Sequence, residues 1–172
     1  GGTRGSDSAR YCYSVWMRHL IRAQSCAGVG LEGTIVELGP GDSVGMGLAA
    51  LLSGARRYIA IDVVQHADTA HNLAVLDELV RLFGERAPVP GDDEFPAVCP
   101  GLDSYAFPDA LLGATAMRRN LAAARVAAIA EALRDGPMAG DADPPVRYVD
   151  PAAAVGLIPR GSVDWVFSQA VL

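Results

Sequence analysis

Cysteine is scarce in this sequence, which holds only Cys12, Cys26 and Cys99 among its 172 residues. An odd number of cysteines without paired metal-ligand spacing argues against a disulfide scaffold or a zinc knuckle. The sequence also opens with no charged-then-apolar leader and holds no apolar run long enough to span a bilayer. We therefore expect reduced thiols, a cytoplasmic location and no membrane partner.

Positive charge is also limited, because 14 Lys and Arg residues face 20 Asp and Glu residues and give a net charge of -6. No basic run stands out along the chain, which argues against a nucleic-acid partner, since such binding depends on neutralising phosphates. Small molecules or proteins are the expected partners. About half of the residues are apolar (51%) and a fifth are charged (20%), so we expect residues 1–172 to form one domain with a sizeable core.

The first 28 residues are expected to form a helix after a polar tail. Ser8 is a suitable N-cap, and the helix should run to about Cys26. Tyr13 and Trp16 are predicted to lie in the core, with the alternative that either lines a ligand pocket. The apolar positions recur at helical spacing: Cys12, Val15, Trp16, His19, Leu20 and Ala23.

Residues 29–64 show a strand, helix, strand pattern. "GTIVEL" is an apolar run suited to a strand buried on both faces, "VGMGLAALLS" is typical of a helix that stops at Gly54, and "RYIAIDVV" is a second buried strand. Such units are almost always parallel and right-handed. The loop after the first strand and the end of the second strand should therefore share one edge of the sheet.

The residues at this edge indicate an adenosine-type ligand. Gly39 and Gly41 allow a sharp turn and a close approach to a ligand at a helix start, and Asp62 follows about twenty residues later, where an acid binds ribose hydroxyls. A dinucleotide motif would need a glycine or alanine where Val44 stands. Glu37 would repel a pyrophosphate and attract a cation. The pattern therefore favours a positively charged cofactor.

The segment "ELGPGDS" resembles the first motif of the class I S-adenosylmethionine-dependent methyltransferases. That motif is an acid followed by glycines at alternate positions, and here it is matched by Glu37, Gly39 and Gly41. Ser43 stands where a third glycine is common, which leaves the close approach of the following helix in question.

Three further segments are similar to this family. "YIAID" ends in an acid, as the second motif does, and an apolar residue follows it; "VRYVDP" resembles the third strand and "GSVDWVFSQAVL" the fourth. The resemblance places the adenine against Val63, the adenine amino group near Asp150, and the cofactor near the end of the fourth strand, which follows Asp164. The residues concerned are Asp62, Val63, Asp150, Ser168 and Gln169.

The resemblance implies an α/β fold, a Rossmann-like three-layer αβα sandwich whose parallel sheet has the order 3-2-1-4. It implies methyl transfer from S-adenosylmethionine to a small-molecule acceptor by in-line displacement, with S-adenosylhomocysteine as product. It assigns no catalytic residue. The cofactor-binding residues it implies are Glu37, Leu38, Gly39, Pro40, Gly41, Ser43, Asp62, Val63, Asp150, Ser168 and Gln169.

Residues 65–145 exceed what a crossover needs, so an insertion is expected between the second and third strands. "TAHNLAVLDELVRLFG" is predicted to be the crossover helix, and residues 85–112 contain five prolines and should be irregular. "TAMRRNLAAARVAAIAEALRDG" is predicted to be a single alanine-rich helix. We expect the insertion to cap the ligand-binding edge, with peripheral decoration as the alternative.

His66 and His71 are five residues apart, not the four that one helix face would need, and no cysteine or carboxylate group completes a metal site. No metal is therefore expected. His66 is a candidate general base for a substrate hydroxyl, although a loop or capping role is favoured over it.

Residues 146–172 are expected to hold the third and fourth strands, with the chain ending at or just past a buried strand. By resemblance, the sequence would then cover the N-terminal half of a catalytic domain and leave an open sheet edge, which favours self-association. Two other functions stay open. One is a nucleotide-binding module without catalysis, and the other is an NAD-dependent oxidoreductase, which Val44 and Glu37 disfavour.

Overall fold

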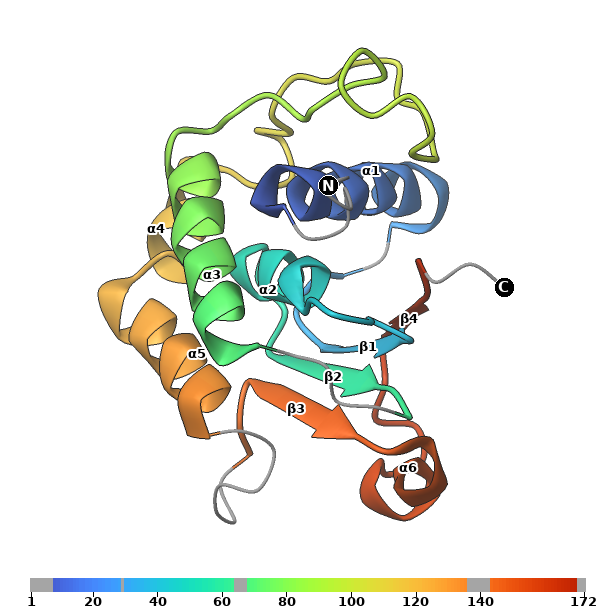
Figure 1. Ribbon diagram of the computed structural model, residues 1–172. Helices are drawn as coiled ribbons and strands as arrows, with labels where there is room; N and C mark the ends of the chain where they lie inside the picture. Colours follow the sequence, from blue (N-terminus) through green and yellow to red (C-terminus); the bar gives the residue numbers. More distant parts are fainter. Residues whose placement is uncertain (1–7, 29, 64–67, 136–142, 170–172) are drawn as a thin grey trace, which may run out of the picture.

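The computed structural model describes residues 8–28, 30–63, 68–135 and 143–169 (Figure 1). Within them, helices and strands alternate in the manner of an α/β fold. In chain order the elements are α1 (Ala9–Ala27), β1 (Thr34–Leu38), α2 (Gly45–Leu52), β2 (Arg57–Ile61), α3 (Thr69–Gly84), α4 (Ala114–Asn120), α5 (Ala123–Asp135), β3 (Val146–Val149), α6 (Pro151–Leu157) and β4 (Trp165–Phe167).

The strands form one four-stranded sheet in the order β3-β2-β1-β4, and every pair is parallel. This confirms the predicted order and the α/β class, and it is consistent with a Rossmann-like fold. In the register, Glu37 of β1 lies between Ala60 of β2 and Phe167 of β4, and Ala60 in turn faces Tyr148 of β3. These four side chains therefore point to the same face of the sheet.

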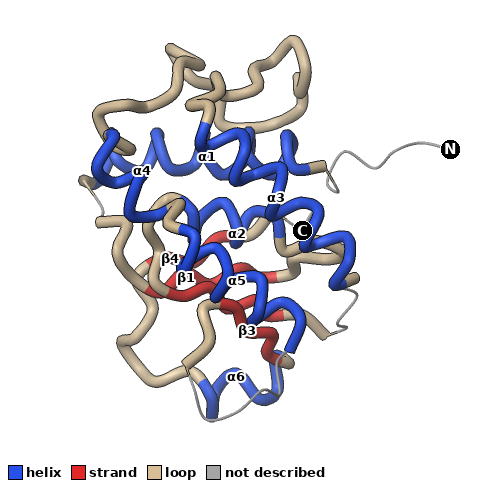
Figure 2. Tube along the Cα trace, turned by 90° about the vertical axis from the view of Figure 1, so that its left-hand side faces the viewer, coloured by secondary structure: helices blue, strands red, loops and turns tan. Residues whose placement is uncertain are grey.

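Helices cover both faces of the sheet, as Figures 1 and 2 show from two directions. On one face, α2 packs against β1 and β2, α5 packs against β3, and α1 and α3 pack against α2. On the other face, α6 lies against β3, over a smaller apolar cluster. The buried members of that cluster are Val36, Ile59 and Val149.

Helix α1 agrees with its sequence prediction at both ends. The Ser8 side chain caps it by accepting a hydrogen bond from the Tyr11 N–H, and Gly28 ends it in the left-handed conformation. Tyr13 and Trp16 are both fully buried, so their predicted core role is confirmed. In the described part of the chain, no helix combines the length and the apolar character needed to cross a membrane.

Helix α2 packs closely against its neighbours because two of its residues are glycines. A Cβ at Gly47 would come within 2.2 Å of the Tyr58 ring of β2, and one at Gly45 would come within 2.5 Å of Cys12 Sγ of α1. Neither side chain is at the end of a long flexible arm, so an alanine at either position would force the packed elements apart. Gly47 therefore permits the close approach of this helix to the sheet that Ser43 left in question.

The long segment between β2 and β3 confirms two predictions. Helix α3 covers the predicted residues, and Asp68 caps it by accepting from the Ala70 and His71 N–H groups. Residues 85–112 contain no helix or strand. They lie along the outer side of α1, where Tyr13 Oη donates to the Ala87 carbonyl (2.7 Å) and Ser14 Oγ donates to the Pro90 carbonyl (2.6 Å).

The prediction of a single helix after residue 112 is wrong, because α4 and α5 are separate helices and the helical structure is interrupted at Leu121 and Ala122. The two helices pack on different partners: α4 contacts α2, whereas α5 contacts α3 and β3. One straight helix cannot reach both. Alanine-rich composition favours helix throughout and carries no sign of this change of direction.

Helix α6 was not predicted. Its signal was present in the sequence, since Asp150 followed by Pro151 is a typical N-cap and first-turn pair, and the Asp150 Oδ1 atom does accept from the Ala152 N–H at 2.7 Å. A short helix with no buried residue gives almost no periodic apolar pattern to detect.

Candidate functional site

The loop that follows β1 forms the centre of the candidate site at the carboxyl edge of the sheet. Gly39 and Gly41 have φ values of 67° and 68°, in the left-handed region where side chains are strained. The Gly39 N–H donates to the Ile61 carbonyl (2.9 Å), which fixes the loop to the end of β2. The predicted need for glycine is therefore a backbone requirement at both positions.

Asp62 lies directly beside this loop. Its Oδ2 atom accepts a hydrogen bond from the Gly41 N–H at 3.1 Å, although 20 residues separate the two in the chain. A Cβ at Gly41 would meet no atom of the described residues within 4 Å, so the described part of the chain leaves space above this glycine. The structure thus brings together the glycine loop and the acid that ends β2, with room for a ligand beside them.

Glu37 is fully buried below the loop rather than exposed at the strand end. Its Oε2 atom accepts a hydrogen bond from Tyr58 Oη at 2.5 Å, while Oε1 has no partner among the described residues. Burial raises the pKa of this carboxyl to about 7; the hydrogen bond from Tyr58 lowers it, and the charge of Asp62 raises it further. A buried carboxylate oxygen without a donor is costly unless a cation or a donor reaches it.

Tyr148 of β3 contributes a second buried polar atom without a partner in the described chain, its hydroxyl oxygen. Burial raises the pKa of Tyr148, and the negative charges of Glu37, Asp62 and Asp42 raise it further. Three carboxylates therefore act on one tyrosine at this edge. The local potential is negative, which favours a cationic ligand group.

Two backbone N–H groups at the start of α2, behind the loop, already donate hydrogen bonds to side chains. The Val44 N–H donates to Asn72 Oδ1 of α3 (3.3 Å), and the Gly45 N–H donates to Ser43 Oγ (3.1 Å). The first N–H groups of a helix normally lack a partner, but these two are already occupied. With them occupied and acids nearby, this helix start is a poor site for a pyrophosphate.

Two apolar side chains at the same edge are left uncovered. Leu38, the last residue of β1, is 43% exposed, and Val63, next to Asp62, is 75% exposed. Large apolar side chains this exposed suit contact with a flat ring. Pro40 lies between the two glycines of the loop and is partly exposed.

The remaining predicted site residues lie at the ends of β3 and β4. Asp150 is occupied as the cap of α6. Ser168 Oγ donates to the Leu38 carbonyl (3.0 Å), and Gln169 Oε1 lies 3.3 Å from His19 Nε2. Ser168 therefore lies beside the end of β1, and Gln169 lies beside α1. His66 falls outside the described residues.

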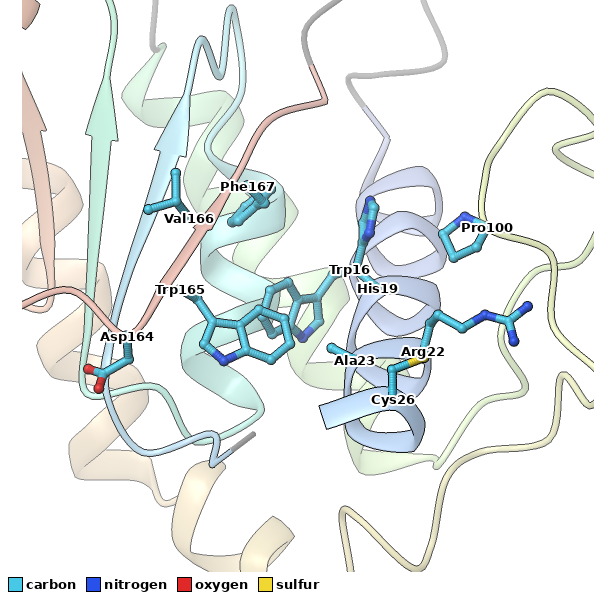
Figure 3. Close-up of a pocket in the computed structure, with 10 residues that line it drawn as sticks. All are labelled: Trp16, His19, Arg22, Ala23, Cys26, Pro100, Asp164, Trp165, Val166 and Phe167. Carbon is cyan, nitrogen blue, oxygen red and sulfur yellow. The ribbon is translucent and has the colours of Figure 1, made fainter. Parts of the chain in front are cut away.

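A cavity of about 450 Å³ lies between α1 and β4, and sequence analysis did not anticipate it. Figure 3 shows Trp16 of α1 facing Trp165 of β4, and the centroids of their rings are 5.7 Å apart. The indole nitrogen of Trp165 is buried with no partner in the described chain. The cavity is lined by Trp16, His19, Arg22, Ala23, Cys26, Pro100, Asp164, Trp165, Val166 and Phe167.

Sequence analysis missed Tyr58, Tyr148 and Asn72. Tyr58 and Asn72 act through partners distant in the sequence, Glu37 and Val44, and Tyr148 is placed by the pairing of β3 with β2. Their only sequence signal was a polar residue inside or beside an apolar element, which has many explanations. The described residues hold no group of three or more His, Cys, Asp or Glu side chains suited to a metal ion. Comparisons with family models, curated proteins and solved structures found no match.

Proposed function

We propose that this chain binds S-adenosylmethionine at the carboxyl edge of its sheet and belongs to a methyltransferase. The observation that carries the proposal is the pair of acids around the glycine loop. In the described part of the chain, Glu37 has a buried oxygen without a partner, and Asp62 accepts from the Gly41 N–H. The proposal is supported by the first-motif pattern together with the position of these acids at the carboxyl ends of the neighbouring strands β1 and β2.

The side chains present fit the parts of this cofactor. Asp62 is an acceptor for the two ribose hydroxyls, and ribose would compete with Gly41 for it. Leu38 and Val63 offer exposed apolar surface to the adenine. Glu37 offers a carboxylate oxygen to the ammonium group of the amino-acid portion, and reaching it requires a small opening of the loop.

The same charges disfavour NAD. Its pyrophosphate would lie near Glu37, Asp42 and Asp62, all of which act electrostatically on Tyr148 at this edge. The N–H groups of Val44 and Gly45, which would normally bind phosphate, are used by Asn72 and Ser43. A cationic cofactor is the better fit.

When bound, S-adenosylmethionine would supply an activated methyl group for transfer to an acceptor. The contribution of this chain is to bind and orient, since in-line displacement depends chiefly on position. We name no catalytic base, because a base is needed only when the acceptor arrives protonated. A small-molecule acceptor is proposed, since the chain carries net negative charge.

A cap role for the insertion is part of this proposal. Its support is the hydrogen bond from the Val44 N–H to Asn72, which ties the first turn of α3 to the glycine loop. By contrast, α4 and α5 pack against α2, α3 and β3, and residues 85–112 pack on α1. The cap function is therefore proposed for the start of α3 alone.

Titration calorimetry with S-adenosylmethionine, S-adenosylhomocysteine and NAD tests the proposal. We expect both adenosyl compounds to bind and NAD to bind much more weakly. Asp62→Ala should weaken adenosyl binding by about tenfold or more, because it removes an acceptor for two hydroxyls. Glu37→Gln should weaken S-adenosylmethionine binding through loss of the charge on the ammonium site.

Asp103→Ala serves as the matched control, since Asp103 is an exposed acid in the irregular segment and lies outside the site. It should leave the affinities unchanged. Preference for NAD would overturn the cofactor assignment in favour of an oxidoreductase. Binding without methyl release to any acceptor in a broad screen would instead support a binding module.

A further inference from the structure

Three arginines from separate parts of the chain surround a hollow at the amino edge of the sheet, opposite the glycine loop. We call it the arginine hollow, and its volume is about 360 Å³. Arg56 precedes β2, Arg119 lies in the last turn of α4 and Arg125 lies in α5. The lining residues are Glu32, Gly54, Arg56, Arg119, Asn120 and Arg125.

Arg125 is held rigidly in this hollow. Its Nη2 atom donates to the carbonyls of Leu51 (2.7 Å) and Ala55 (2.6 Å) at the end of α2, and it thereby offsets the negative end of that helix. Its Nε atom is buried with no partner among the described residues. Burial lowers the pKa of Arg125, and repulsion from Arg119 lowers it further.

Asn120 supplies a second unpartnered donor. The residue is only 2% exposed, its Oδ1 atom lies 3.5 Å from Arg119 Nε, and its Nδ2 atom has no acceptor in the described chain. Nδ2 lies beside the hollow, 3.5 Å from where a Cβ would stand on Gly54. A buried amide donor without an acceptor is unusual in a folded protein and indicates a missing acceptor.

The charge of the hollow is positive although the chain as a whole carries -6. Three guanidinium groups face the single carboxylate of Glu32, which pairs with Arg119 at 3.3 Å and is 74% exposed. This pair is weak because both partners are open to solvent. Glu32 is thus a displaceable counter-ion.

We propose that the arginine hollow binds the phosphate group of a small phosphorylated molecule or free phosphate. Guanidinium groups offer paired N–H donors that match the oxygens of a phosphate, and Asn120 Nδ2 offers a further donor at the buried side. The bound dianion would relieve the repulsion between Arg119 and Arg125. This site is independent of the proposed methyl-transfer function.

Calorimetry with inorganic phosphate and with glycerol phosphate, at fixed ionic strength, tests the proposal on the whole chain. Saturable binding of either probe is expected, and acetate should bind more weakly. A stronger response to glycerol phosphate would indicate a phosphorylated metabolite, and an equal one free phosphate. Arg119→Gln should weaken binding by about tenfold. Glu32→Gln should strengthen it by about threefold, because it frees Arg119.

Arg118→Gln is the matched control, since it removes the same charge from the neighbouring residue of α4, which does not line the hollow. It should change the affinity by less than about twofold. No saturable binding of either probe would overturn the proposal. Equal losses in Arg119→Gln and Arg118→Gln, or no gain in Glu32→Gln, would also overturn it, because they would indicate general charge attraction.

Discussion

Glu37 meets two conflicting demands at the scale of a single residue. A ligand cation requires its carboxylate to be ionised, whereas complete burial beside Tyr58 and near Asp62 favours the neutral acid. With its pKa raised from 4.5 to about 7, the folded chain binds the proton of this group more tightly than the unfolded chain does. Above pH 7, the ionisation of the buried Glu37 carboxyl therefore lowers the stability of the ligand-free protein.

The sign of the effect on stability follows from that shift. The contribution that the protonated Glu37 carboxyl makes to the free energy of unfolding is fully present below pH 4.5, and it is lost as the pH rises through about 7. Above that range its ionisation costs roughly 3 kcal/mol. Glu37→Gln should therefore stabilise the free protein at pH 8 and flatten this part of the pH profile, as measured by urea unfolding at several pH values.

The exposed Glu131→Gln change is the control and should leave the profile unaltered. If Glu37→Gln were destabilising at every pH, the ionised carboxylate would have to be stabilised by the fold itself. That result would contradict the assignment of Glu37 as a site awaiting a cation.

Sequence analysis identified the residues of the glycine loop but not the environment of Glu37. The backbone needs of Gly39 and Gly41 follow from their local pattern, and both have left-handed φ values. The burial of Glu37 depends on Tyr58, whose ring fits under α2 only because residue 47 is glycine. This packing involves β1, β2 and α2 together, so it cannot be predicted from the sequence of any one of these elements.

At the scale of elements, the irregular segment of residues 85–112 is organised by one buried arginine. Arg18 of α1 is fully buried and donates to the carbonyls of Val98 (2.7 Å) and Pro90 (3.1 Å) and to Asp92 Oδ1 (3.0 Å). Its guanidinium group also lies 5.1 Å from the centre of the Tyr105 ring. The prolines leave this segment with few backbone N–H donors, and the guanidinium group of Arg18 supplies donors to its carbonyl groups instead.

Arg18→Met should destabilise the fold by about 3 kcal/mol or more, because it leaves buried carbonyls without donors. The segment should also become accessible to proteases. Arg22→Met, one turn later, is the control. Arg22 is exposed and donates to the Gly101 carbonyl, so its loss should cost less than about 1 kcal/mol. Urea unfolding and limited proteolysis measure the two effects, and equal effects in both variants would contradict the role of Arg18.

The elements differ in how well sequence analysis predicted them. Strong apolar periodicity predicted α3 correctly, from Thr69 to Gly84. The break between α4 and α5 is set by what each helix packs against, and α6 buries no residue and so has no apolar stripe. Local patterns therefore predict elements whose own residues make the core, and miss boundaries that tertiary contacts decide.

At the scale of the whole molecule, the described sheet has β3 at one edge and β4 at the other. Among the described residues β4 pairs only with β1, Val166 is 60% exposed, and the cavity lined by Trp16, Trp165 and Phe167 lies beside this strand. A free strand edge next to an apolar cavity favours pairing with another chain. We therefore predict that this chain self-associates through β4.

Sedimentation velocity over a range of concentrations measures this association. Val166→Lys should shift the population toward monomer, because a charge on an edge strand opposes pairing. Val155→Lys is the matched control, since Val155 is a 91% exposed valine on α6, which lies against β3 at the other edge of the sheet, and it should have no effect. A monomer at every concentration, or an equal shift in both variants, would contradict association through β4.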